Sequence, residues 1–321
     1  MTQAQLITAA TGAALLAHRR YEIDRTKRVE VFSALRKAAG EVFFRPLRKI
    51  CGAYLPLKDC PPGVLINSNL PLSRQRYTAA HEFGHLFLNH SAVSVDEMTG
   101  LSFEERRNWS DEENIAETFA AFFLMPQALV ESSLRDLNIT ALDPETAYLL
   151  SLKMGTSYRA TVNHLQTLRK LSGAQAARFR DIPPKQIKSG ISEHVAARHD
   201  VWVLDEHWNG QQVFPAVQDT IVLHLREIPT SGYTWMWHRS PEILSMVEDK
   251  FADEATSTVG GERVRELILE VASCDHPDRI DLERRQPWDA DSEPSAFFNV
   301  DLVPQEIRKS GPLVLPTLQA T

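Results

Sequence analysis

The feature that most constrains this chain is the run His81-Glu-Phe-Gly-His85, which the apolar residues 86–88 follow. Two helical residues four positions apart lie on the same face, so both imidazoles can reach one metal ion. Zinc binds histidine nitrogens at about 2.0–2.1 Å. Glu82 would then border the metal and act as general base on a water held there. If the run is helical, it therefore predicts a zinc site that hydrolyses peptide bonds.

The residues around this motif favour a helix. Pro71-Leu-Ser73 can begin a helix that continues to Leu88, which places the motif inside the helix rather than at a frayed end. Gly84 costs roughly 1 kcal/mol relative to alanine in mid-helix, so a strand or the third metal ligand is expected to approach closely there. The alternative is a buried amphipathic helix whose histidines make ordinary hydrogen bonds, because a short motif also occurs by chance.

A second helix offers the third ligand that catalytic zinc needs. Residues 110–126 carry the helix cap Ser110, acids in the first turn and Pro126 as the stop. Glu113 and Glu117 are four residues apart on one face of this helix. We predict Glu113 as the third ligand and Glu117 as the acceptor that fixes the tautomer of a ligand imidazole. The alternative is that both acids only complement the helix N-terminus.

Residues from about 29 to 169 resemble the ImmA/IrrE family of metallopeptidases. The resemblance implies His81, His85 and Glu113 as zinc ligands with Glu82 as the catalytic residue. The chain departs from the family at Glu117, where the family usually has asparagine, and the extra charge could raise the basicity of a ligand histidine. The matching segments are Gly52-Ala-Tyr-Leu55, Pro62-Gly-Val-Leu-Ile-Asn-Ser68, Arg74–Leu88 and Glu113–Pro126.

The same resemblance implies a substrate, which the residues by themselves do not. Such enzymes make one cut in a helix-turn-helix repressor encoded nearby and so release a stress, phage-defence or mobile-element programme.

Cys60 precedes the strand expected at 64–68, which should border the cleft, and its thiolate could fill the open zinc position. The alternative is an inert loop cysteine. His90 and Tyr77 are candidates for oxyanion stabilisation whose direction the sequence cannot establish.

Composition indicates a globular protein inside the cell. The 321 residues are 43% hydrophobic and 24% charged, which allows two or three domains. The three cysteines, Cys51, Cys60 and Cys274, form no close pair and indicate reduced thiols in a cytoplasm. Basic residues follow the apolar stretch 6–17 instead of preceding it, so we expect no signal peptide. No run approaches the ~18 apolar residues of a membrane span, so we expect no membrane anchor.

Positive charge gathers in the middle of the chain. Residues 151–190 hold eight Lys or Arg and one acid, whereas the whole chain has a net charge of −7. The stretch from Lys153 to Lys188 could meet phosphates, and single-stranded DNA that activates the peptidase is one hypothesis. The alternative is a solvated surface that lies against the acidic C-terminal third.

The C-terminal part changes to a β pattern after residues 181–194, which carry two prolines and a glycine and are predicted to be a linker without helical periodicity. Turn signals such as Asn209-Gly210 separate short alternating strands, which indicates an antiparallel sandwich. The strands are expected at 201–204, 213–217, 220–225, 233–237, 264–271, 279–282 and 297–303.

Three segments of this sandwich resemble the chagasin-like inhibitors of papain-type cysteine proteases. They are Pro229-Thr-Ser-Gly-Tyr-Thr-Trp235, Gly260-Gly261 and Arg284-Arg-Gln-Pro-Trp288. Ile228 and Gln286 depart from the family in the loops that would enter a protease, so a partner-binding or sensing module is the preferred interpretation. Trp235, Trp237 and Trp288 are predicted in the core, because aromatic side chains are usually buried, with an anchor surface as the alternative.

We therefore predict an α+β chain of four parts. Residues 1–150 form a zincin-like metallopeptidase domain, 151–180 a basic helical extension, 181–194 a linker and 195–321 an immunoglobulin-like, chagasin-like β-sandwich. The predicted function is a cytoplasmic, gluzincin-like zinc endopeptidase that cleaves a repressor. The alternatives are a catalytically silent regulator on a zinc-stabilised scaffold and a cysteine-protease inhibitor.

Overall fold

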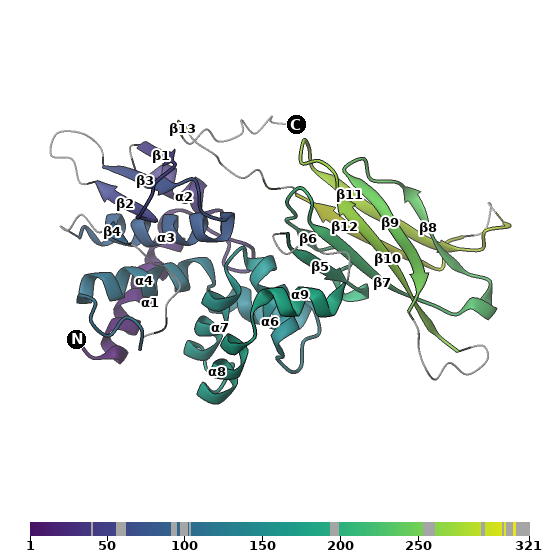
Figure 1. The fold of residues 1–321 in the computed structure, drawn as a ribbon, viewed down its shortest axis with the longest axis horizontal. Coiled ribbons are helices and arrows are strands. Elements are labelled where there is room, and N and C mark those ends of the chain that lie inside the picture. Colours follow the sequence, from purple (N-terminus) through teal and green to yellow (C-terminus); the bar gives the residue numbers. More distant parts are fainter. Residues whose placement is uncertain are drawn as a thin grey trace. The chain divides into compact units, whose positions relative to one another are not determined.

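The computed structural model describes residues 1–39, 41–55, 62–90, 95–96, 102, 104–192, 199–252, 261–289, 293–303, 305 and 311–312. The chain divides into two compact units. Unit 1 comprises Met1–Leu134, Ala141–Asp181 and Ile307–Thr321, and unit 2 comprises Arg135–Thr140 and Ile182–Glu306. Unit 1 is helical with a small sheet and unit 2 is β-sandwich-like, so the predicted α+β class is confirmed (Figure 1). None of the described helices is long and apolar enough to span a membrane.

The sheet of unit 1 has five strands, in the order β13-β1-β3-β2-β4. β1 and β3 are parallel, and the other neighbours are antiparallel. The strand expected at 64–68 is β3, but it lies in the middle of the sheet, with β2 between it and β4. β13 belongs to this sheet, although the sequence analysis places its residues with the sandwich. The strands are β1 (Glu41–Arg45), β2 (Gly52–Leu55), β3 (Gly63–Asn67), β4 (Val95–Asp96) and β13 (Gly311–Pro312).

Two helices of unit 1 carry the motifs found in the sequence. α3 (Leu72–Leu88) contains the run His81–His85 and ends at Asn89, which has a left-handed conformation. α4 (Asp111–Leu124) begins after Ser110, whose hydroxyl accepts a hydrogen bond from the Glu113 amide. The sheet lies on one side of α3 and α4 on the other (Figure 1). The remaining helices of the unit are α1 (Gln3–Arg20), α2 (Val31–Ala38), α5 (Gln127–Asp136), α6 (Pro144–Met154), α7 (Tyr158–Thr167) and α8 (Gly173–Asp181).

Aromatic packing fixes α3 against α4. The Phe83 ring contacts the rings of Phe119 and Phe123 edge-on, with centroids 5.7 and 5.0 Å apart. All three side chains are fully buried. Edge-to-face pairs of this kind contribute about 0.5–1.5 kcal/mol each beyond the burial of their area. Because Phe83 lies inside the His81–His85 run, the same core that stabilises the unit also sets the spacing of the motif from α4.

Unit 2 contains two four-stranded sheets, in the orders β5-β7-β10-β9 and β6-β12-β11-β8. The prediction of an antiparallel sandwich is wrong at two pairs, because β5 with β7 and β6 with β12 are parallel. The chain leaves β5 for the other sheet and then returns beside it, so β7 runs in the same direction. The strands are β5 (Val201–Leu204), β6 (Gln212–Val213), β7 (Thr220–Glu227), β8 (Thr234–Arg239), β9 (Leu244–Phe251), β10 (Arg263–Val271), β11 (Asp278–Arg285) and β12 (Ala296–Leu302).

A buried carboxylate connects the two sheets of unit 2. Glu227 on β7 accepts hydrogen bonds from the Trp235 amide at 2.7 Å and the Thr234 hydroxyl at 2.8 Å, both on β8. Arg265 on β10 donates to the same oxygen at 3.2 Å. Burying a charge is costly unless it is paired and hydrogen-bonded. The three donors to Glu227 therefore keep a charged group at the junction of the sheets.

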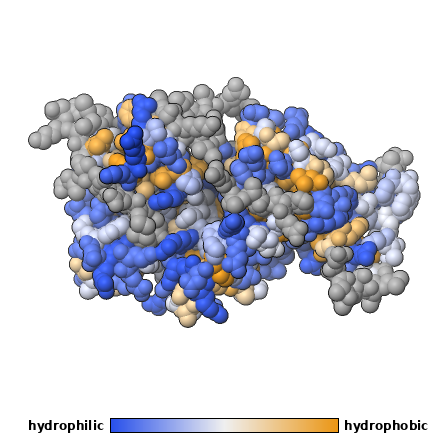
Figure 2. All heavy atoms as spheres, viewed as in Figure 1, coloured by the Kyte–Doolittle hydropathy of each residue, from blue (hydrophilic) through white to orange (hydrophobic). Residues whose placement is uncertain are grey.

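Two sequence predictions for unit 2 are wrong. Residues 181–194, predicted to lack helical periodicity, contain the helix α9 (Pro184–Ile191), and Pro184 occupies its first turn, where a missing amide hydrogen costs nothing. The core prediction also fails for the three tryptophans. Trp235 and Trp237 are half-buried and Trp288 is 71% exposed. In the view of Figure 2, hydrophilic residues cover most of the surface and hydrophobic residues lie in small separate patches.

Candidate metal centre

Three donor atoms meet between α3 and α4. His81 Nε2 lies 3.1 Å from His85 Nε2, and Glu113 Oε2 lies 3.3 Å from the first and 3.5 Å from the second. The positions on α3 follow from the spacing of four residues in a helix. Glu113 lies in the first turn of α4, where the Ser110 hydroxyl fixes its amide. Among the residues that the structure describes, these three form the one group suited to hold a metal ion.

This triangle fits a zinc ion. Bonds of about 2.0–2.1 Å in a tetrahedral shell place neighbouring ligand atoms roughly 3.3–3.4 Å apart, which is close to the three observed distances. Zinc also accepts imidazole nitrogens and carboxylate oxygens as ligands. Three protein ligands leave the fourth position of the tetrahedron open. Both histidines are buried, whereas Glu113 is 22% exposed, so the cluster reaches solvent on the side of α4.

Glu117 holds the other nitrogen of His81. Its Oε2 lies 3.2 Å from His81 Nδ1, and both groups are buried. With Nδ1 as the donor, the Nε2 lone pair of His81 faces His85 and Glu113. The two acids therefore do more than complement the helix N-terminus, since both contact the same imidazole from adjacent turns of α4.

Glu82 points from α3 toward β2. The side chain is buried, and a Cβ added at Gly52 of β2 would lie 3.3 Å from its Oε1. The same added atom would overlap Thr78 Cγ2 and lie 2.9 Å from the Leu65 carbonyl oxygen. The absence of a side chain at Gly52 thus lets β2 approach α3 beside the carboxylate that the sequence analysis predicts as the base.

Gly84 allows the close approach of α4. A Cβ at Gly84 would lie 3.0 Å from Phe119 Cδ1 and 3.2 Å from Ala116 Cα. The sequence analysis expects a strand or the third ligand at this point. The neighbour is instead the backbone of the helix that carries Glu113, one turn beyond that residue.

His90, one of the two candidates for oxyanion stabilisation, contacts a residue of the cluster. Its Nδ1 lies 2.9 Å from His85 Nδ1, so one of the two rings donates to the other. Burial, together with His85, lowers the pKa of His90 below its usual value. Tyr77, the other candidate for oxyanion stabilisation, is directed elsewhere, because its hydroxyl donates to the Glu117 carbonyl at 3.3 Å. The left-handed Asn89 folds the chain back toward His85, which no spacing rule reveals.

Two further predictions bear on the surroundings of the cluster. Cys60 lies outside the described residues. In the basic stretch, Arg159 pairs with Glu105, Lys170 with Glu131 and Lys188 with Asp200.

Comparisons with known proteins agree with both resemblances. Residues 37–161 match the model of the IrrE N-terminal-like domain, a peptidase family, and residues 215–302 match the chagasin family of peptidase inhibitors. The comparison with curated proteins gave no match.

Solved structures similar to parts of the chain include a cysteine protease inhibitor, EhICP2, from Entamoeba histolytica. The match is 22% identical, covers 33% of this chain and 97% of the inhibitor chain, and has a TM-score of 0.31. The solution structure of amebosin is 21% identical over 33% of this chain and 98% of its own, with a TM-score of 0.28. A Mycobacterium tuberculosis transcriptional regulator is 11% identical over 81% of this chain and 76% of its own, with a TM-score of 0.33.

Proposed function

We propose that this chain, whose residues 37–161 match the IrrE N-terminal-like peptidase family, is a zinc-dependent endopeptidase of the zincin-like, gluzincin type. The observation that carries the proposal is the triangle of His81 Nε2, His85 Nε2 and Glu113 Oε2, with sides of 3.1, 3.3 and 3.5 Å. Neutral imidazoles that turn both Nε2 lone pairs toward the Glu113 carboxylate at these distances would repel it. A bound divalent cation removes this repulsion.

Each residue of the cluster then has a distinct task. His81, His85 and Glu113 hold the metal, and Glu117 keeps the proton of His81 on Nδ1. A zinc ion held there supplies Lewis acidity that polarises the scissile carbonyl. Glu82 accepts a proton from the attacking water and delivers it to the leaving amine. Burial beside β2 excludes bulk solvent from this carboxylate and so strengthens its interactions during proton transfer.

The proposed substrate is a helix-turn-helix repressor encoded nearby. It rests on the family resemblance, as do the stress, phage-defence or mobile-element programmes that its cleavage would release. The described cysteines, Cys51 and Cys274, form no disulfide, which is compatible with a cytoplasmic location. Single-stranded DNA stays a possible activator through the basic stretch.

The test is cleavage of the neighbouring repressor by the full-length protein, with and without single-stranded DNA. We expect one discrete cut by the wild type. Glu82→Gln should lose the cut while it retains one zinc per chain, because Glu82 moves protons and does not hold the metal. Equal cleavage by Glu82→Gln would rule out its role as base. No cut by the wild type under either condition would instead favour a silent regulator that uses the metal as a scaffold.

One observation favours a second function, the inhibition of a papain-type cysteine protease by unit 2. Trp288 is 71% exposed and lies across Gly232, where an added Cβ would be 2.9 Å from its Cζ2. Ile228, at the start of the same loop as Gly232, is 43% exposed. These loops correspond to the segments that resemble the chagasin family. Papain activity measured with the full-length protein and with Trp288→Ala tests this function, and unchanged papain activity with the wild-type protein would exclude it.

A further inference from the structure

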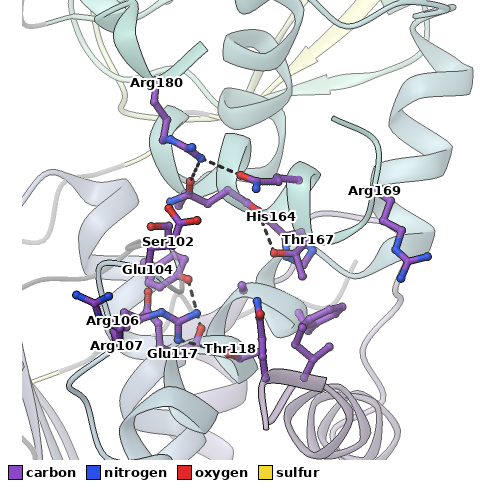
Figure 3. A pocket seen from close by; sticks show the side chains of 18 residues that line it. Ser102, Glu104, Arg106, Arg107, Glu117, Thr118, His164, Thr167, Arg169 and Arg180 are labelled. Carbon is purple, nitrogen blue, oxygen red and sulfur yellow. Dashed lines mark hydrogen bonds between the residues drawn. The ribbon is translucent and has the colours of Figure 1, made fainter. Parts of the chain in front are cut away.

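Unit 1 contains a polar cavity of about 480 Å³ to which the proposed function assigns no ligand (Figure 3). It lies on the side of α4 that faces α7 and α8. Glu117 lines it and contacts His81, so the cavity adjoins the metal cluster. Arg180 lies at one end, Arg106 and Arg107 lie at the other and Arg169 lies at the side (Figure 3). These side chains come from three separate segments, so a chance cluster within one helix does not explain them.

The described lining carries an excess of positive charge. The described lining residues include four arginines, Arg106, Arg107, Arg169 and Arg180, and two acids, Glu104 and Glu117. Burial lowers the pKa of His164, which also lines the cavity, to about 4, so this imidazole is neutral at pH 7. The lining therefore has a net charge of about +2. A phosphate monoester carries about −1.5 to −2 at this pH, so a single group of this class would balance the cavity.

Two of these arginines are held in place by the protein. Arg106 is buried and donates from Nη1 to the Asn114 carbonyl at 3.2 Å and to the Thr118 hydroxyl at 3.4 Å. Arg180 donates from Nη1 to the side-chain oxygens of Asn163 and Gln166, both at 2.9 Å. An ordered guanidinium loses less conformational entropy when it binds a phosphate than a mobile one, and its fork of donors matches phosphate oxygens.

The backbone at Arg169 determines which substitution tests the cavity. This residue follows α7 with a φ of 58°, a left-handed conformation that glycine usually occupies at the end of a helix. For a residue with a side chain it costs about 1–2 kcal/mol. Glycine can therefore replace Arg169 without strain, which removes a guanidinium from the lining and leaves the end of α7 intact.

The size and the apolar wall of the cavity define the rest of the ligand. Ile7, Ala121, Phe122 and Ala160 line it without any polar side-chain atom. Cavities of about 300–1,000 Å³ hold small organic ligands, so an inorganic phosphate would leave most of this space empty. We propose that the cavity binds a phosphate monoester with a planar organic body, of the size of a nucleoside monophosphate.

The experiment is calorimetric titration of the full-length protein with adenosine 5′-monophosphate in a buffer free of phosphate. We expect one binding site per chain. Adenosine, which lacks the charged group, and inorganic phosphate, which lacks the planar body, should each bind at least tenfold more weakly. Arg169→Gly should weaken binding of the monophosphate at least fivefold and leave the melting temperature equal or higher, because glycine relieves the left-handed backbone.

Lys170→Gln is the matched control. It removes the same charge one residue further on, from a side chain that pairs with Glu131 and does not line the cavity. The Lys170→Gln variant should bind the monophosphate with an affinity within twofold of that of the wild type. Equal losses in Arg169→Gly and Lys170→Gln, or equal affinities for adenosine and its monophosphate, would overturn the proposal. So would binding of a single-stranded oligonucleotide in the absence of any binding of the monophosphate, which would assign these cations to nucleic acid.

Discussion

Glu117 Oε2 lies 3.2 Å from His81 Nδ1, while Nε2 of the same ring lies 3.3 Å from Glu113 Oε2. One imidazole therefore lies between two carboxylates from adjacent turns of α4. Glu113 offers its oxygen beside Nε2, where the metal is proposed, and Glu117 fixes which nitrogen carries the proton. A negative acceptor polarises the N–H more than a neutral amide does, so this histidine should be a stronger ligand than one held by asparagine.

We predict that Glu117→Gln lowers zinc affinity by about tenfold, since partners of ligand histidines typically contribute 10–100-fold. The amide keeps an acceptor for His81 Nδ1 but removes the charge. Competition with a chromophoric chelator measures this affinity. Glu131→Gln removes the same charge from α5, where the side chain pairs with Lys170, and should change the affinity less than twofold. If both variants lost the same zinc affinity, Glu117 would act only through the net charge of the protein.

Gly52→Ala should destabilise unit 1. The new methyl would overlap Thr78 Cγ2 and lie 2.9 Å from the Leu65 carbonyl oxygen, and overpacking of this kind costs about 1–3 kcal/mol. At Gly63 on β3, the nearest atom to an added Cβ is 3.9 Å away, so Gly63→Ala should leave stability equal or higher. Urea denaturation followed by circular dichroism compares the variants, and equal stabilities would contradict the close packing of β2 on α3.

The stability of unit 1 should fall in mild acid because of His164. This imidazole is buried and its Nε2 lies 2.8 Å from the Met125 carbonyl oxygen, and burial lowers its pKa to about 4. The unfolded chain takes up a proton near pH 6.5 while the folded chain does not. The contribution of neutral His164 to the free energy of unfolding is therefore complete above pH 6.5 and is lost as the pH falls from 6.5 to 4. Between pH 7 and pH 5 the loss should be roughly 2 kcal/mol.

His164→Gln keeps a donor near the Met125 carbonyl and removes the titration. Its free energy of unfolding, measured in urea at pH 7 and at pH 5, should change less between the two pH values than that of the wild type. The same pH dependence in both proteins would show that other groups are responsible for the acid sensitivity.

The helices around the cluster could be predicted from the sequence because their determinants are local. The spacing of His81 and His85, the cap at Ser110 and the stop at Pro126 all act within one or two turns, and both helices form where they are expected. The contact of His90 with His85 could not be predicted in this way. It depends on the left-handed turn at Asn89, which a sequence pattern does not specify.

Unit 2 shows where patterns fail. β9 (Leu244–Phe251) is missing from the expected strands because it lies at a sheet edge and most of its side chains are exposed, so its residues do not alternate. The parallel pairs arise from the path of the chain between the sheets, which is a tertiary property. Trp288 is exposed although tryptophan is usually buried, because its loop extends beyond the sheets at the end of β11.

The central claim is that His81, His85 and Glu113 form one zinc site, and X-ray absorption at the zinc edge tests it most directly. The full-length protein, loaded with one equivalent of zinc, should show only nitrogen and oxygen neighbours at about 2.0–2.1 Å, with the multiple scattering of two imidazoles. His85→Ala should lose one imidazole. A sulfur neighbour at about 2.3 Å would instead bring a cysteine such as Cys60 into the site, and an unchanged spectrum in His85→Ala would contradict the assignment.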